Sequence, residues 1–128
     1  MNSAPYTKSL NVFILKGMLS MVNLGLVVRL HAKPGKESDV ENLLREGLLM
    51  IQDEPSTIAW FAFRIDALTF GVFDGFPNEA GRQEHLSGKL ATFLMQKSSE
   101  LFSSPPIIEK IDVIAAKLPQ LKKDEYEE

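Results

Sequence analysis

Residues 57–76 read TIAWFAFRIDALTFGVFDGF, and this stretch decides the fold of the chain. Apolar and aromatic residues dominate residues 57–65 and 69–76, and the three-residue connection between them is short enough for an antiparallel hairpin. Six of the eleven aromatic residues of the chain fall within this stretch. The pattern therefore predicts two paired strands with a dense aromatic surface.

The residues before this hairpin predict a strand and a helix. Residues 24–32 are typical of a first strand, and the turn sequence KPGK at residues 33–36 ends it. Apolar residues then recur at helical spacing up to Ile51, and the helix is expected to end before Pro55. Gly47 lies on the apolar face of this helix, where a glycine is tolerable if the helix must approach another element closely.

The residues after the hairpin predict a second helical region and a last strand. Asn78 is a suitable N-cap for a short helix that reaches Leu86, and Ser87 can cap its continuation. Residues 107–117 are typical of a fourth strand. The order βαββαβ predicts an α+β, ferredoxin-like fold, with a four-stranded antiparallel sheet and the helices on one face.

Both faces of this sheet are expected to be apolar. Along the second strand Phe61 and Phe63 point to one side, while Trp60 points to the other. Large apolar surfaces are rarely left exposed on monomers. We therefore expect a homodimer in which two sheets pack face to face, with the helices outside.

The composition indicates one ordinary globular domain. Of the 128 residues 45% are hydrophobic and 24% charged, and the chain has no cysteine, which excludes disulfides and cysteine chemistry. We expect the domain at residues 23–119, after an N-terminal extension at residues 1–22 and before a charged tail at residues 120–128.

The charge and the N-terminal sequence bear on partners and location. The net charge of −3 lies largely in the tail, so the body has little electrostatic attraction for nucleic acid or an anionic membrane. Lys16 divides the apolar N-terminal residues into runs too short to span a bilayer. We expect a cytoplasmic protein that binds neither nucleic acid nor membranes.

Four segments carry a resemblance to a known family. They are RLHAKPGK at residues 29–36, EPSTIAW at 54–60, TFGVFDGF at 69–76 and RQEHLSGK at 82–89. In this order they resemble the antibiotic biosynthesis monooxygenase family, over about residues 24–118. The resemblance implies a dimeric α/β-barrel whose small members are oxidoreductases that convert phenols to quinones with O₂, without metal or flavin.

The resemblance leaves three functions open. The first is a cofactor-independent monooxygenase that oxidises a small phenolic or polycyclic aromatic compound to a quinone. The second is a non-catalytic, dimeric small-molecule-binding or accessory protein. Haem degradation, the third, is less well supported, since the haem-degrading members carry an asparagine in the first strand where this chain has Val28.

Two residues of the second helical region are the candidate catalytic residues. His85 lies where the family has its helix histidine, and a neutral imidazole can accept a phenolic proton. Alternatively it is a helix-end histidine bonded to backbone or solvent. Arg82 lies three residues before it on the same side of the helix, where it can stabilise an anion or pair with Glu79.

Four further residues are candidates for substrate binding. Trp60 and Phe76 can form aromatic walls of a pocket or fill the core. Arg64 shares a strand face with Trp60 and marks either a pocket mouth or the wet edge of the sheet. Asp74 is either a second acid or base, or a link between subunits. With two histidines and no ligand spacing, the sequence predicts no metal site and no cofactor.

Overall fold

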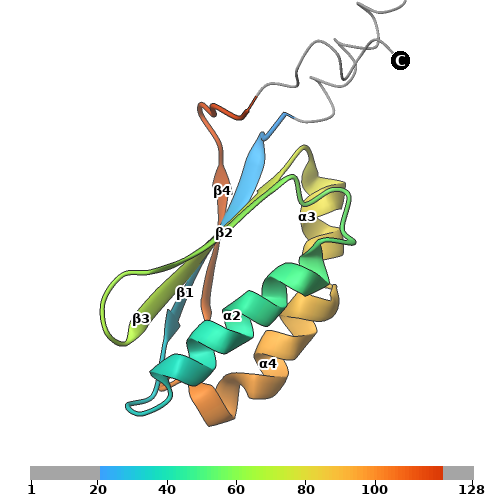
Figure 1. The fold of residues 1–128 in the computed structure, drawn as a ribbon. Helices are drawn as coiled ribbons and strands as arrows, with labels where there is room; N and C mark the ends of the chain where they lie inside the picture. Colours follow the sequence, from blue (N-terminus) through green and yellow to red (C-terminus); the bar gives the residue numbers. More distant parts are fainter. Residues whose placement is uncertain (1–20, 120–128) are drawn as a thin grey trace, which may run out of the picture.

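The structure, a computed structural model, describes residues 21–119. Its strands are β1 (Leu24–His31), β2 (Ala59–Arg64), β3 (Thr69–Phe76) and β4 (Ile107–Asp112). Its helices are α2 (Glu37–Ile51), α3 (Glu79–Leu86) and α4 (Lys89–Leu101). The helices lie together on one face of the sheet (Figure 1), so the predicted α+β, ferredoxin-like fold is confirmed.

The sheet has the order β2-β3-β1-β4, and every neighbouring pair is antiparallel. In β3 and β1, Asp74 lies opposite Leu26 and Val72 opposite Val28, and these side chains face the helices. Trp60 of β2 lies opposite Asp74, so it is on the helix side as well. The register therefore places an indole and a carboxylate next to each other beneath the helices.

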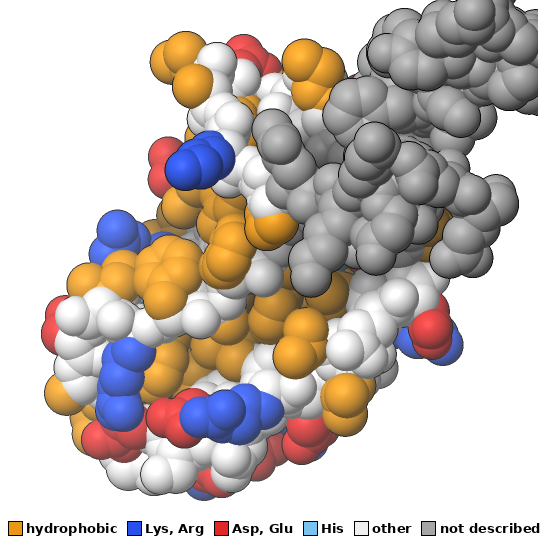
Figure 2. Space-filling model, turned by 45° about the horizontal axis from the view of Figure 1, so that its top comes forward, with side chains coloured by type: hydrophobic (Ala, Val, Ile, Leu, Met, Phe, Trp, Pro, Cys, Tyr) orange, Lys and Arg blue, Asp and Glu red, His pale blue; other side chains and the backbone are white. Residues whose placement is uncertain are grey.

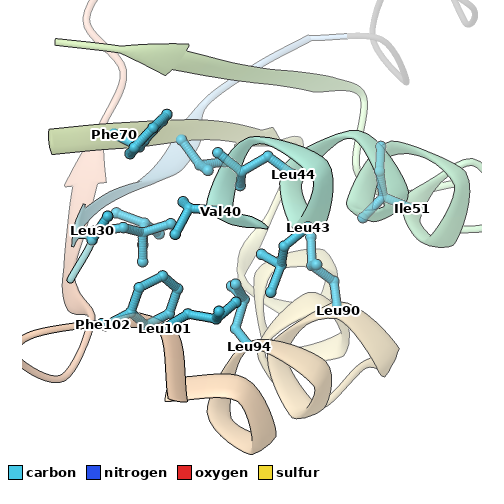
Figure 3. Close-up of a cluster of buried hydrophobic side chains, with 13 residues drawn as sticks. Leu30, Val40, Leu43, Leu44, Ile51, Phe70, Leu90, Leu94, Leu101 and Phe102 are labelled. Atoms are coloured by element: carbon cyan, nitrogen blue, oxygen red, sulfur yellow. The ribbon is translucent and has the colours of Figure 1, made fainter. Parts of the chain in front are cut away.

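The main core lies between α2, α4 and the two central strands (Figure 3). Leu30 and Phe70 extend from the strands toward Val40 and Leu44 of α2, and α4 closes the cluster from the other side. Leu30 and Val40 are completely buried. Burial of such side chains, worth about 1.5–3 kcal/mol each, holds the helix layer on the sheet.

Several boundaries differ from the sequence prediction, most clearly in the second half of the chain. The second helical region is two helices, and α4 begins after Gly88 without a side-chain cap, so the prediction that Ser87 caps it was wrong. The Ser87 hydroxyl instead donates to the carbonyls of Gln83 and Glu84 at the end of α3. The last strand ends at Asp112, five residues before the predicted end at residue 117.

The predicted N-terminal extension at residues 1–22 and the charged tail at residues 120–128 lie outside the described residues, except for Met21 and Val22. Among residues 21–119, no helix combines the length and apolar character needed to cross a membrane.

The sheet face away from the helices is apolar, as the strand pattern predicted. Phe61 and Phe63 of β2 are 59% and 43% exposed, and Ile107 of β4 is 47% exposed. Between them Phe73 lies 6.5 Å from Phe61, measured between ring centroids. We call this surface the open sheet face. Hydrophobic side chains also gather around a hollow at the surface shown in Figure 2.

The packing predicts a large difference between two leucines. We expect Leu30→Ala to lower the free energy of unfolding by about 2–5 kcal/mol, because Leu30 is wholly buried and its removal leaves a cavity. Leu49→Ala, at an exposed position of α2, should change it by less than about 0.5 kcal/mol. Urea unfolding of both variants measures the difference. Equal losses would show that Leu30 does not belong to the core.

Candidate active site

The site is built around His85, whose two ring nitrogens each face a carboxylate. Nδ1 lies 2.7 Å from Oε1 of Glu54, and Nε2 lies 3.2 Å from Oδ2 of Asp74. The Thr57 hydroxyl donates to the same Glu54 oxygen over 2.7 Å. We call Glu54, His85 and Asp74 the carboxylate–histidine row. It joins the loop before β2, helix α3 and strand β3.

Local structure fixes the position of His85. The Asn78 side chain accepts a hydrogen bond from the Gly81 amide over 2.9 Å and so caps the first turn of α3, as the sequence predicted. His85 lies in the last turn of this helix and is 5% exposed. The Phe76 ring packs against the imidazole with the ring centroids 5.4 Å apart. The imidazole is therefore held by packing as well as by its partners.

Both Asp74 and His85 have shifted pKa values. Burial raises the pKa of Asp74 above its ordinary value of 3.8, although the neighbouring His85 opposes the shift. Burial also disfavours the charged form of His85. The hydrogen bonds and negative charges of Asp74 and then Glu54 outweigh that effect, so the pKa of His85 rises above 6.5. The protonated form of His85, in which both ring nitrogens can donate to the carboxylates, is therefore favoured relative to a free histidine.

The two shifts give the stability a definite dependence on pH. Because the pKa of His85 is higher in the folded chain, its stabilising effect is complete below pH 6.5 and is lost as the pH rises through the raised value. The raised pKa of Asp74 acts in the same direction, because the cost of ionising a buried carboxyl appears as the pH rises above 3.8.

A cavity of about 130 Å³ lies between the sheet and the helices beside the row. Its lining is apolar apart from Trp60, Asp74 and His85. Met95 and Ile108, the most exposed of the lining residues, mark its opening between α4 and β4. The cavity therefore combines water-excluding walls with three polar side chains, as small-molecule sites do.

Two polar atoms of the cavity-lining residues are unusual. Within residues 21–119, neither Nε1 of Trp60 nor Oδ1 of Asp74 has a hydrogen-bond partner, although both are buried. Leaving such an atom without a partner costs about 1–3 kcal/mol. Buried polar atoms without partners are rare in folded proteins and occur at functional sites. Trp60 Nε1 offers a donor, and ionised Asp74 Oδ1 offers an acceptor.

Gly47 of α2 allows Leu90 to pack closely against the helix backbone. A Cβ at this position would lie 3.0 Å from Cδ1 of Leu90 and 3.6 Å from Cζ2 of Trp60. The distance to Trp60 is an ordinary contact, but the distance to Leu90 is unusually short, so the glycine serves the close approach of Leu90, as the sequence predicted.

Arg82 lies outside the cavity lining. Its guanidinium donates to the carbonyls of Gly25 and Ile111 over 3.2 and 3.3 Å, and it pairs with Glu79, the alternative that the sequence left open. Arg82 therefore ties α3 to β1 and β4. Its position gives no support to the predicted role as an anion stabiliser.

The two other predicted substrate-binding residues also lie outside the cavity. Arg64 lies near the end of β2, donates to the carbonyls of Asp66 and Ala67, and lies 3.8 Å from a Glu41 oxygen. It lines a separate surface groove of about 460 Å³ along β2 and α2. Phe76 is fully buried behind His85. Of the six predicted site residues, only Trp60, Asp74 and His85 meet at the cavity.

The sequence analysis missed Glu54 as a site residue and treated it only as part of a turn. Glu54 lies 31 residues before His85, and no spacing rule connects them. Its place directly before Pro55, ahead of the aromatic strand, was the available signal. Among residues 21–119, no group of His, Asp and Glu side chains is arranged to hold a metal ion.

The carboxylate–histidine row predicts an elevated pKa for His85 that depends on both partners. We expect an NMR titration to give a midpoint above 6.5 for the His85 ring. Asp74→Asn should lower it more than Glu54→Gln, because Asp74 contributes more to the shift. The chain has two histidines, so a His31→Gln variant assigns the signals and serves as the control. An unchanged midpoint in both carboxylate variants would contradict the row.

Comparison with known proteins places the chain among solved structures. No family model and no curated protein matches it. A protein of unknown function from Nitrosomonas europaea is 50% identical with a TM-score of 0.76, over 78% of this chain and 97% of that chain.

More distant structures share the architecture. A proposed antibiotic biosynthesis monooxygenase from Caulobacter crescentus is 14% identical with a TM-score of 0.65, over 80% of this chain and 99% of that chain. Another, from Chloroflexus aurantiacus, is 13% identical with a TM-score of 0.60, over 74% of this chain and 96% of that chain. The chain therefore has the fold of the antibiotic biosynthesis monooxygenases that its sequence resembles, and it belongs to one family with the Nitrosomonas europaea protein of unknown function.

Proposed function

We propose that this protein is a monooxygenase that oxidises a small phenolic compound to a quinone with O₂, without a metal or an organic cofactor. The observation that carries the proposal is the buried Oδ1 of Asp74, which has no partner within residues 21–119 and belongs to a residue that lines an apolar cavity. Proteins with the same fold are named as antibiotic biosynthesis monooxygenases, which supports the reaction class.

Asp74 is the proton acceptor in this proposal. Both ring nitrogens of His85 already face carboxylates, and its protonated form has no lone pair for a phenolic proton. The Oδ1 atom of Asp74 is the buried carboxylate oxygen of the row that has no partner within residues 21–119. Because burial raises the pKa of Asp74, its basicity moves toward that of a phenol, which favours proton transfer between them.

His85 and Glu54 act as positioning residues. His85 holds Oδ2 of Asp74 at 3.2 Å, which fixes the orientation of the carboxylate. The hydrogen bond and positive charge of protonated His85 also favour the ionised form of Asp74, against the larger effect of its burial. Glu54 in turn holds the imidazolium on its other side. This arrangement differs from the expectation that His85 itself deprotonates the substrate.

The reaction balances with O₂ as the only co-substrate. The phenolic O–H proton passes to Asp74, and the electron-rich phenolate transfers electrons to O₂. A bond forms between one oxygen atom and a ring carbon, and the O–O bond breaks. That oxygen becomes the second quinone carbonyl. The other leaves as water with the phenolic and ring protons, so the four electrons that the phenol loses are the four that O₂ gains.

The apolar lining supports this chemistry physically. Val28, Val72 and Leu90 exclude water from the carboxylate and the substrate. In such surroundings charge interactions are stronger than in water, and reactive intermediates are protected from hydrolysis. O₂ is itself apolar and can enter an apolar cavity without losing hydrogen bonds to water.

Oxygen-electrode measurements with electron-rich phenols test this function. We expect uptake that depends on the protein, and Asp74→Asn should lower turnover at least about 100-fold, since it removes the base. Leu49→Ala, at an exposed site on α2, should leave turnover unchanged. Full uptake by the Asp74→Asn variant would contradict the assigned base. Binding of phenols without any uptake would instead favour a non-catalytic binding protein.

We propose further that the protein works as a homodimer that buries the open sheet face. Phe61, Phe63 and Ile107 form an exposed apolar surface there, of the kind that marks protein–protein contacts. Arg29 and Glu109 lie on the same face of neighbouring strands, opposite Ile107 and Val27. One charge of each sign suits a two-fold interface, in which each pairs with its opposite on the second copy.

Analytical ultracentrifugation tests the dimer. Wild-type protein should sediment as a dimer at micromolar concentration. Phe61→Glu should sediment as a monomer, because it places a charge in the middle of the buried face. Leu49→Glu, on the helix layer, provides a matched control that stays dimeric. A monomeric wild-type protein would refute the proposal.

A further inference from the structure

The cavity is lined by two residues whose unpartnered atoms have complementary hydrogen-bonding roles. Trp60 and Asp74 lie directly opposite each other on β2 and β3, on the side that faces the helices. Both line the same cavity, and both have a buried polar atom without a partner within residues 21–119. Opposed residues on paired strands bring their side chains close together.

The chemistry of these two atoms selects a ligand group. The indole Nε1–H can only donate, and an ionised carboxylate oxygen can only accept. A group that satisfies both must accept one hydrogen bond and donate another. A hydroxyl does so with a single oxygen atom, which suits a confined and otherwise apolar site.

The size of the cavity limits the rest of the ligand. Its volume is about 130 Å³. An apolar cavity of about 150 Å³ in another protein takes up benzene, so a space of this size admits one aromatic ring. Val72, Leu90 and Leu94 supply apolar walls on which such a ring can pack.

We infer that the ligand of this cavity is a single-ring phenol, whose hydroxyl accepts from Nε1 of Trp60 and donates to Oδ1 of Asp74. The inference rests on the proposed function for the fate of the hydroxyl proton, and it narrows the substrate from small phenolic or polycyclic compounds to one ring. Trp60 is then the specificity-determining residue.

Binding under anaerobic conditions tests the inference apart from the oxidation. Trp60 is the only tryptophan of the chain, so its indole N–H gives one side-chain signal in a ¹⁵N-resolved NMR spectrum. We expect phenol to shift this signal, and calorimetry to show binding at least about tenfold tighter than that of toluene, which has no hydroxyl, or anisole, which cannot donate. 2-Naphthol, with a second ring, should also bind at least about tenfold more weakly than phenol.

Variants of the two contact residues sharpen the test. Trp60→Phe keeps an aromatic ring but removes the donor, so phenol affinity should fall about tenfold while toluene affinity stays the same. Leu49→Ala, on the exposed face of α2, should bind as the wild type does. If Trp60→Phe does not fold, the ligand series on the wild-type protein still decides the question.

The outcomes separate this inference from the proposed function. Equal affinity for phenol and toluene, tight binding of 2-naphthol, or an indole signal that phenol does not move would overturn the inference, even if another compound supports oxygen uptake. Selective phenol binding with the indole shift supports it. The same binding result without oxygen uptake would support the phenol-binding site and contradict the proposed monooxygenase activity.

Discussion

A carboxylate buried in the middle of a sheet is the constraint on which the site depends. Asp74 is 1% exposed, and an isolated charge at such depth is too costly to persist. Protonation of His85 supplies a compensating positive charge, and Glu54 lies against the imidazole on the opposite side. Because these residues come from a strand, a helix and a loop, their ion pairs also fix how α3 and the loop before β2 lie against the sheet. Oδ1 of Asp74 keeps no partner among residues 21–119.

One part of the helix layer packs the main core, and another part lines the cavity. Leu30, Phe70 and Val40 fill the main core without polar groups, and this gives the fold its stability. The cavity lies beside α3 and α4. Apolar side chains line most of it, and Trp60 and Asp74 contribute polar groups. A buried site of this kind needs a rigid surround, since unpartnered polar atoms would otherwise draw in water or collapse onto neighbours.

Sequence patterns predicted the elements well where the signal was local. Alternating apolar residues gave the hairpin of β2 and β3, and Asn78 gave the start of α3. The pattern failed at Ser87, because a hydroxyl at a helix junction can serve either helix. Here it bonds the carbonyls of α3. His85, Trp60 and Asp74 were recognisable as candidates by chemical type, but Arg64 and Arg82 were equally plausible by that criterion.

The sequence by itself determined the fold class, because periodicity and turn residues act over a few positions. It also determined that the site would contain no cysteine, because the chain has none. Only the tertiary structure decided the roles of the candidate site residues. The hydrogen bonds of His85 reach Glu54, 31 residues away, so its proton-accepting capacity is visible only once the chain has folded. Likewise, only the register of β2 on β3 sets Trp60 opposite Asp74, because strand pairing joins residues that no local pattern relates.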